Sequence, residues 1–145
     1  MLGQLIVGAA VSAVTIVIHA LVMATVVRVA HTINQRKKWL PPLHLSVVMV
    51  ATVFVLMLAH IAEVVVWSLA YVLVGAAPPG ADPLYFALVN YTTLGYGDIL
   101  PAEGWRLLGP LTAMDGILLF GWSTAVIFAV LRKTMLPDEP TDDVE

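Results

Sequence analysis

The sequence predicts an all-α membrane protein with three transmembrane helices and a short re-entrant helix between the second and the third. Composition supports this fold class, because 60% of the 145 residues are hydrophobic, 12% are charged, and mean hydropathy is +0.93. Soluble domains average about 45–50% apolar and about 25% charged residues. The second observation is three apolar runs that are each long enough to cross a bilayer: 5–30, 43–74 and 107–131.

Charge and cysteine content exclude several classes of protein. The formal net charge is −3, which is too weak to argue for a polyanionic partner, so no nucleic acid is expected. Without cysteine, the chain can form no disulfide, thiolate metal site or cysteine nucleophile.

The first apolar run has two interpretations. A signal peptide needs a basic segment before a short apolar stretch, whereas residues 1–4 carry no basic side chain and the run is too long. We therefore expect residues 1–32 to form an additional N-terminal transmembrane helix.

The basic residues predict the orientation. Arg36, Lys37 and Lys38 lie in the loop 33–42, and Arg132 and Lys133 follow the third run, whereas residues 75–104 contain no lysine or arginine. By the positive-inside rule, the N-terminus and residues 75–104 face outward and the C-terminus is cytoplasmic, in a protein we expect in the cell membrane. Residues 133–145 form an acidic tail that we expect to be disordered.

The segment between the second and third runs has its own pattern. After a turn-forming stretch at 75–82, Asp82 and Pro83 form a helix N-cap followed by proline at the first helical position. Residues 83–92 then predict a helix too short to cross a membrane. The glycines at 95 and 97 in the next stretch, Thr-Leu-Gly-Tyr-Gly-Asp (93–98), break a helix and permit positive φ. Such a backbone is tolerated at membrane depth where it lines a water-filled cavity.

The stretch 91–98, Tyr-Thr-Thr-Leu-Gly-Tyr-Gly-Asp, resembles the selectivity-filter signature of the potassium channel pore-domain family. The resemblance covers residues 43–132 and implies their order: outer helix 43–74, turret 75–82, pore helix 83–92, filter 93–98 and inner helix 107–131. A chance re-entrant turn is the alternative, and the agreement of motif and topology argues against it.

The resemblance also implies the ligands of the ion. The carbonyl groups of four residues would bind potassium, together with the Thr93 hydroxyl: Thr93, Leu94, Gly95 and Tyr96. Gly97 would set the backbone conformation, and Asp98 would lie at the outer mouth. Potassium would be the sole bound species, with no cofactor and no other metal. Since the family surrounds the ion with four loops, three identical subunits and the lipid bilayer are the implied partners.

Three departures from the family pattern concern the support of the filter. Leu94 replaces the commoner valine, and Tyr85 and Phe86 stand where a tryptophan pair is common. Val89 occupies the position where some members place a glutamate that bonds to the aspartate matching Asp98, so that bond cannot form here.

The third apolar run carries a candidate hinge and a candidate cavity face. Gly116 lies where the family's inner helix has its hinge, although close helix packing would also explain a glycine there. At about 100° per residue, four side chains share one face that would line the cavity, unless that face contacts lipid: Ile117, Phe120, Thr124 and Phe128.

Four ionisable residues lie at matched depth in the three runs. At about 1.5 Å per residue, these residues come near one level and would form a buried polar cluster: His19, His60, Glu63 and Asp115. His60 and Glu63 could also supply half of a metal site, but the His-Glu-x-x-His pattern is absent, so we expect a structural network. If its protonation biases Gly116, current should depend on pH.

The predicted function is a potassium-selective channel that conducts K⁺ passively, without enzymatic activity. Three alternatives were weighed: a non-selective cation channel, a membrane-embedded hydrolase using His60 and Glu63, and a non-conducting subunit. No regularly spaced arginine helix is present, so the sequence indicates no usual voltage sensor and leaves the gating stimulus open.

Overall fold

The computed structural model describes residues 1–35 and 42–135, and it is helical throughout its regular elements. The helices are α1 (Leu2–Gln35), α2 (Pro42–Val74), α3 (Pro83–Tyr91) and α4 (Leu108–Met135), with a 3₁₀ turn η1 (Glu103–Trp105) before α4. Three of them are long and apolar enough to cross a membrane, and no strand occurs in the described residues. The predicted fold class, with three membrane-length helices, is confirmed.

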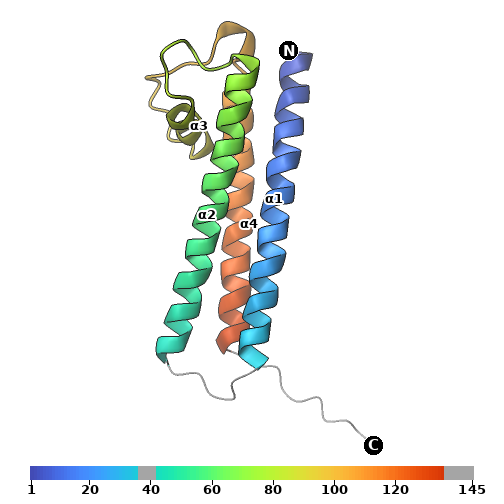
Figure 1. The fold of residues 1–145 in the computed structure, drawn as a ribbon, viewed down its shortest axis with the longest axis vertical. Helices are drawn as coiled ribbons and strands as arrows, with labels where there is room; N and C mark the ends of the chain where they lie inside the picture. The colour runs from blue at the N-terminus through green and yellow to red at the C-terminus, as the bar shows by residue number, and fades with distance from the viewer. Residues whose placement is uncertain (36–41, 136–145) are drawn as a thin grey trace, which may run out of the picture.

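The three long helices lie side by side, and α3 flanks one end of them (Figure 1). α1 packs against α2 and α4, and α3 packs against the same two helices from the other side. The N-terminus lies at the end that carries α3, and α4 runs from that end to the opposite one. We call these the α3 end and the far end.

Some helix ends differ from the expected limits. α1 continues to Gln35 and α2 begins at Pro42, so residues 33–35 and 42 of the predicted loop 33–42 are helical. Its residues 36–41 lie outside the described part. α4 continues to Met135, beyond the predicted end at 131. The predicted disordered tail at 133–145 lies outside the described residues from position 136 onward. Hydropathy marks the end of an apolar run, whereas a helix can continue through polar residues beyond it.

α3 begins where the capping pattern predicts. The Asp82 carboxylate accepts hydrogen bonds from the backbone N–H groups of Leu84, at 2.9 Å, and Tyr85, at 3.4 Å, and Pro83 occupies the first turn. A side-chain cap of this kind satisfies N–H groups that have no partner within the helix. The predicted N-cap is confirmed, and it fixes the point at which the chain turns back into the bundle.

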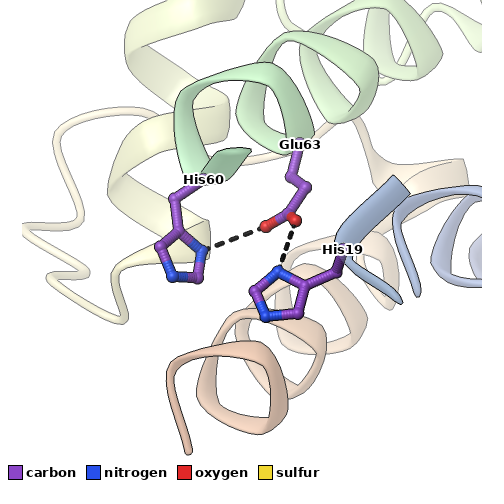
Figure 2. Close-up of side chains that lie close together, drawn as sticks. All are labelled: His19, His60 and Glu63. Carbon is purple, nitrogen blue, oxygen red and sulfur yellow. Dashed lines mark hydrogen bonds and ion pairs between the residues drawn. The ribbon is translucent and has the colours of Figure 1, made fainter. Parts of the chain in front are cut away.

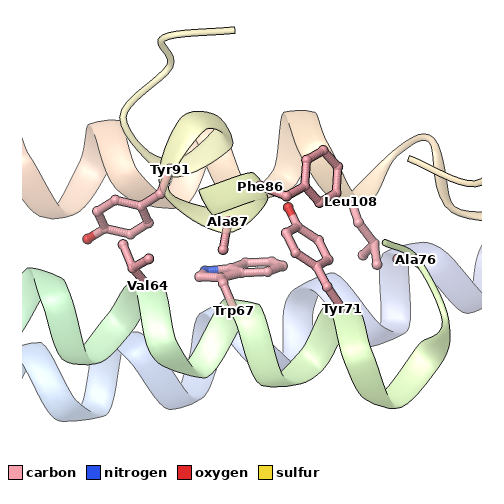
Figure 3. Close-up of a cluster of buried hydrophobic side chains, with 8 residues drawn as sticks. All are labelled: Val64, Trp67, Tyr71, Ala76, Phe86, Ala87, Tyr91 and Leu108. Atoms are coloured by element: carbon pink, nitrogen blue, oxygen red, sulfur yellow. The ribbon is translucent and has the colours of Figure 1, made fainter. Parts of the chain in front are cut away.

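An aromatic cluster holds α3 against α2 (Figure 3). Trp67 and Tyr71 of α2 are fully buried beneath Phe86 and Ala87 of α3, and the Tyr71 and Phe86 rings lie 4.9 Å apart. Burial of an aromatic side chain contributes about 1.5–3 kcal/mol. This cluster fixes a helix of only nine residues, which would be marginal alone.

A second apolar cluster joins the three long helices toward the far end. Its buried members come from α1, α2 and α4: Met23, Val26, Ala30, Leu56, Val126 and Val130. On α2, His60 and Glu63 therefore lie between the two clusters, since Leu56 belongs to one and Val64 to the other.

Gly116 provides the closest approach between α3 and α4. A Cβ atom at this position would overlap the backbone oxygen of Tyr91 and lie 3.0 Å from its carbonyl carbon. Because these neighbours are backbone atoms, they have little freedom to move. Close packing therefore explains this glycine, whereas its predicted role as a hinge is untested.

We predict that Gly116→Ala separates α3 from α4 and destabilises the folded protein by about 1–3 kcal/mol, the usual cost of overpacking. Thermal unfolding of the detergent-solubilised protein, followed by circular dichroism, measures this change. Gly121→Ala is the matched control, since no atom lies within 4 Å of a Cβ built there. Equal unfolding temperatures for the two variants would contradict the packing role.

Candidate functional site

The loop after α3 has an alternating backbone conformation. Thr93, Gly95 and Gly97 have φ angles of 60°, 56° and 76°, whereas Thr92 has an ordinary right-handed helical conformation. Thr93 is the one residue other than glycine with positive φ in the described chain. A β-branched residue is strained in this region, and such strain is typical of functional sites. We call residues 93–98 the 93–98 loop.

Hydrogen bonds to α3 orient the first peptide groups of this loop. The N–H of Thr93 donates to the Asn90 carbonyl, and the N–H of Leu94 donates to the Val89 carbonyl, both at 3.0 Å. Gly95 donates to the same Val89 carbonyl at 3.4 Å. In a trans peptide the C=O points opposite to the N–H that follows it. The carbonyl groups of Thr92, Thr93 and Leu94 therefore point away from α3.

The 93–98 loop lies open on the surface of the single chain. Every residue from Thr93 to Asp98 is exposed, including the apolar Leu94, which is 52% exposed, and Tyr96, which is 70% exposed. The predicted ligand residues Thr93 to Tyr96 thus form one exposed strip of backbone, and the carbonyl groups of Thr93 and Leu94 in it point away from α3.

Tyr85 ties the end of this loop to α3. Its hydroxyl donates a 2.8 Å hydrogen bond to the Asp98 carboxylate. The sequence excluded a hydrogen bond between position 89 and Asp98, because position 89 is a valine. Tyr85, one turn earlier on α3, makes a hydrogen bond to Asp98 instead. The hydrogen bond to Asp98, with a smaller effect of its negative charge, raises the pKa of the Tyr85 hydroxyl. The bond is therefore retained at neutral pH and is lost only as the pH rises through that raised pKa.

The predicted cavity face lies along one side of α4. Ile117, Phe120, Thr124 and Phe128 are all exposed in the single chain, whereas Leu119, Ser123, Val126 and Val130 on the other side are buried against the bundle. Phe120 also packs against the rings of His60 and Tyr91, at 4.5 and 5.5 Å. The exposed side of the stripe is open to water, lipid or another chain.

The structure brings together three of the four residues of the predicted polar cluster (Figure 2). Both rings of the histidine pair point their Nδ1 atoms at Glu63. The distance to one carboxylate oxygen is 2.7 Å from His19 of α1, and the distance to the other is 3.0 Å from His60 of α2. His19 and Glu63 are fully buried.

Two further residues complete this cluster, and sequence reasoning missed both. Tyr91 of α3 donates its hydroxyl proton to Glu63 and lies 2.9 Å from His60 Nδ1. Ser123 of α4 places its Oγ 3.0 Å from His60 Nε2 and 3.3 Å from His19 Nε2. Ser123 lies two turns beyond Asp115 on α4, and this helical spacing is a signal that could have found it.

Asp115 belongs to a separate network, nearer the α3 end. Its carboxylate accepts hydrogen bonds from Thr15 of α1 and from the indole N–H of Trp67 of α2, both at 2.8 Å. Thr15 lies one turn from His19 on α1, and Trp67 lies one turn from Glu63 on α2. The single four-residue cluster expected from depth alone is therefore two hydrogen-bonded layers.

The histidine cluster also has the composition of a metal site. One ligand atom from each of His19, His60 and Glu63 lies within 4.8 Å of the others. However, the Nδ1 atoms and both carboxylate oxygens already join one another in hydrogen bonds. These contacts fit the structural network expected from the sequence, and the absence of a metal stays a prediction.

Comparison with known proteins identifies the family. The ion channel family model matches residues 44–133, which is more than half of the chain. The chain belongs to the ion channel family. Searches against curated proteins and against solved structures returned no match.

The channel domain contains α2, α3, the 93–98 loop and nearly all of α4. α1 lies outside the matched residues, yet it contributes His19 and Thr15 to the two polar layers of the channel domain. With three membrane-length helices, this ion channel is a membrane protein.

We predict that Asp98→Asn lowers the pKa of Tyr85, because a neutral amide no longer favours the protonated hydroxyl. Tyrosinate absorbance measured against pH, relative to the Tyr85→Phe variant, isolates this group. Glu103→Gln is the control, because Glu103 is an exposed carboxylate paired with Arg106. A Tyr85 titration that is the same in Asp98→Asn and in the unmodified channel would contradict the assigned bond.

Proposed function

We propose that the protein is a potassium-selective channel in which the 93–98 loop is the selectivity filter. The observation that carries the proposal is the alternation of positive φ at Thr93, Gly95 and Gly97 together with carbonyl groups turned away from α3. Potassium channel filters replace the ion's hydration shell with rings of backbone carbonyl oxygens. In this proposal the ligands are the carbonyl groups of Thr93, Leu94, Gly95 and Tyr96 and the Thr93 hydroxyl.

The proposed assembly is a homotetramer. One chain has one such loop, and a single strip of carbonyl groups cannot enclose an ion. The exposure of Leu94, Tyr96 and the α4 stripe in the single chain supports packing against further copies. In the tetramer the stripe from Ile117 to Phe128 would line a cavity below the filter.

The direction of α3 favours a cation in that cavity. The C-terminal end of the helix, at Tyr91, leads directly into the proposed filter. Helix C-termini carry a partial negative charge of roughly half an elementary charge. Four such helix ends pointing toward a common cavity would stabilise a partly dehydrated cation there.

The proposed orientation follows from the basic residues and from the relative placement of the ends. The N-terminus shares the α3 end with the filter loop, and α4 ends at the far end with Arg132 and Lys133. By the positive-inside rule the far end is cytoplasmic and the filter faces outward in the cell membrane.

We predict that the purified full chain in liposomes conducts potassium down its gradient and that Gly95→Ala reduces this flux at least about tenfold. Alanine is disfavoured at a φ of +56° by roughly 1–2 kcal/mol in each subunit, and four subunits share the pore. Gly104→Ala is the matched control, since Gly104 has no positive φ and no neighbour within 4 Å. Absence of flux from the unmodified protein would refute the proposed function, and equal flux from both variants would refute the filter assignment.

We also predict that the detergent-solubilised channel has the mass of four 15.6 kDa chains in native mass spectrometry. Potassium channel filters are built from four such loops, and each chain here supplies one. A monomer or dimer that retains potassium flux after reconstitution would contradict the tetramer.

A further inference from the structure

Four side chains in the middle of the bundle close a ring of hydrogen bonds. Glu63 contacts His19 Nδ1 at 2.7 Å, and His19 Nε2 contacts Ser123 Oγ at 3.3 Å. Ser123 Oγ contacts His60 Nε2 at 3.0 Å, and His60 Nδ1 returns to Glu63 at 3.0 Å. We call these residues the polar ring; three of them are drawn in Figure 2.

The number of protons in this ring follows from its geometry. Each of the four contacts needs one proton to be a hydrogen bond, and a serine hydroxyl supplies one. Tyr91 donates its hydroxyl proton to Glu63 and supplies none to these four contacts. The other three must therefore come from Glu63, His19 and His60. An ionised carboxylate with two neutral imidazoles supplies only two. A ring with all four hydrogen bonds therefore holds one proton more than an ionised Glu63 with two neutral histidines. We call this additional proton the third proton.

Two arrangements supply three protons, and both are neutral overall. In one, Glu63 is protonated and both histidines are neutral; in the other, Glu63 is ionised and one histidine is an imidazolium. The two interconvert when protons shift along the ring. A neutral ring suits its position, because an uncompensated charge at membrane depth is costly.

Loss of the third proton breaks the ring at one place. With Glu63 ionised and both histidines neutral, each Nδ1–H still donates to the carboxylate, and both Nε2 atoms become acceptors. The Ser123 hydroxyl can donate to only one of them. The other Nε2 then faces a serine oxygen across an unbonded contact, which is unfavourable for buried polar groups. Deprotonation thus loosens the attachment of α4 to α1 and α2.

Tyr91 connects the ring to the proposed filter. Its hydroxyl donates to Glu63, its ring lies 6.0 Å from that of His60, and its backbone carbonyl packs against Gly116 of α4. Two residues later the chain enters the strained conformation of Thr93. Tyr91 therefore links Glu63 and α4 to the start of the proposed filter.

We propose that His19, Glu63, His60 and Ser123 are positioning residues for the filter and that their shared third proton makes conduction dependent on pH. In this arrangement α1 takes part in filter support through His19. Potassium flux falls as the pH rises, when the ring loses its third proton. The inference rests on the proposed function, because the filter is what the ring positions.

The other ionisable groups that face the ring are few among the described residues. α3 contributes Tyr91, and α4 contributes Asp115, whose carboxyl group lies in the neighbouring layer with Thr15 and Trp67. α1 and α2 contribute the ring members themselves. When Asp115 is ionised, its negative charge favours retention of the third proton and so opposes the loss of a hydrogen bond from the polar ring.

The decisive variant is Glu63→Gln. A glutamine amide can donate N–H to one Nδ1 and accept N–H from the other, so the ring closes with two neutral histidines and needs no third proton. We expect potassium flux from liposomes to decline between about pH 5 and about pH 10 in the unmodified channel, a range that spans imidazole titration. In Glu63→Gln, flux at neutral pH is retained within about twofold and the decline is lost. Glu103→Gln, the control, keeps the decline.

Ser123→Ala provides an independent test, since it changes no titratable group. Without the serine oxygen, the imidazolium loses the acceptor for its Nε2–H, and a hydrogen bond to a charged group contributes about 1.5–3 kcal/mol. The third proton should bind about tenfold more weakly, so the midpoint of the flux decline moves about one unit toward lower pH. Ser123→Thr restores the hydroxyl and the original midpoint.

Imidazole ¹⁵N spectra of the unmodified chain test the ring without relying on flux. Shared protons predict that His19 and His60 titrate together in one step. Independent titration of the two rings, a Glu63→Gln flux profile that matches the unmodified channel, or one bound zinc per purified chain would each overturn the inference. If the unmodified protein shows no flux, the proposed function fails, and the ¹⁵N spectra still decide whether the shared proton exists.

Discussion

A bilayer interior offers no hydrogen-bonding partner to a backbone or side-chain polar group, so a chain that crosses it must pair these groups internally. Three long helices meet this requirement for their own backbones. The loop after α3 departs from it by turning the carbonyl groups of Thr92, Thr93 and Leu94 away from the helix that precedes it. That departure is stable at membrane depth only if something polar meets those oxygens. A partly dehydrated cation enclosed by four such strips satisfies the requirement, which is the physical basis of the proposed function.

A strained loop needs a fixed support, and the rest of the channel domain supplies it. Asp82 fixes the beginning of α3, and the buried rings of Trp67 and Tyr71 hold its face. Gly116 allows the backbone of Tyr91 to approach α4 more closely than any side chain would permit. Tyr85 secures Asp98 at the end of the loop. The polar ring adds α1 to this support, although α1 lies outside the residues that the ion channel family model matches.

The sequence predicted the parts of the fold that depend on local chemistry. Hydropathy found the three long helices, and the Asp82–Pro83 pair found the beginning of α3 to the residue. Depth counting brought His19, His60 and Glu63 to one level, because the rise of a helix is regular. It could not separate Asp115 into its own layer, since rotation about each helix axis and the partners Thr15 and Trp67 are set by packing. It also missed Tyr91, because a re-entrant helix does not start at the membrane surface and its depth cannot be counted. The role of Gly116 in packing likewise depends on how closely α3 approaches α4.

In the proposed filter, the oxygens of the 93–98 loop replace the water of a potassium ion more favourably than that of a sodium ion. The most direct test is the reversal potential of the unmodified channel in a planar bilayer, with potassium on one side and an equal concentration of sodium on the other. A carbonyl-lined filter predicts a large potential whose sign is that of selective potassium flow. A reversal potential near zero, with current carried equally by both ions, would contradict the account.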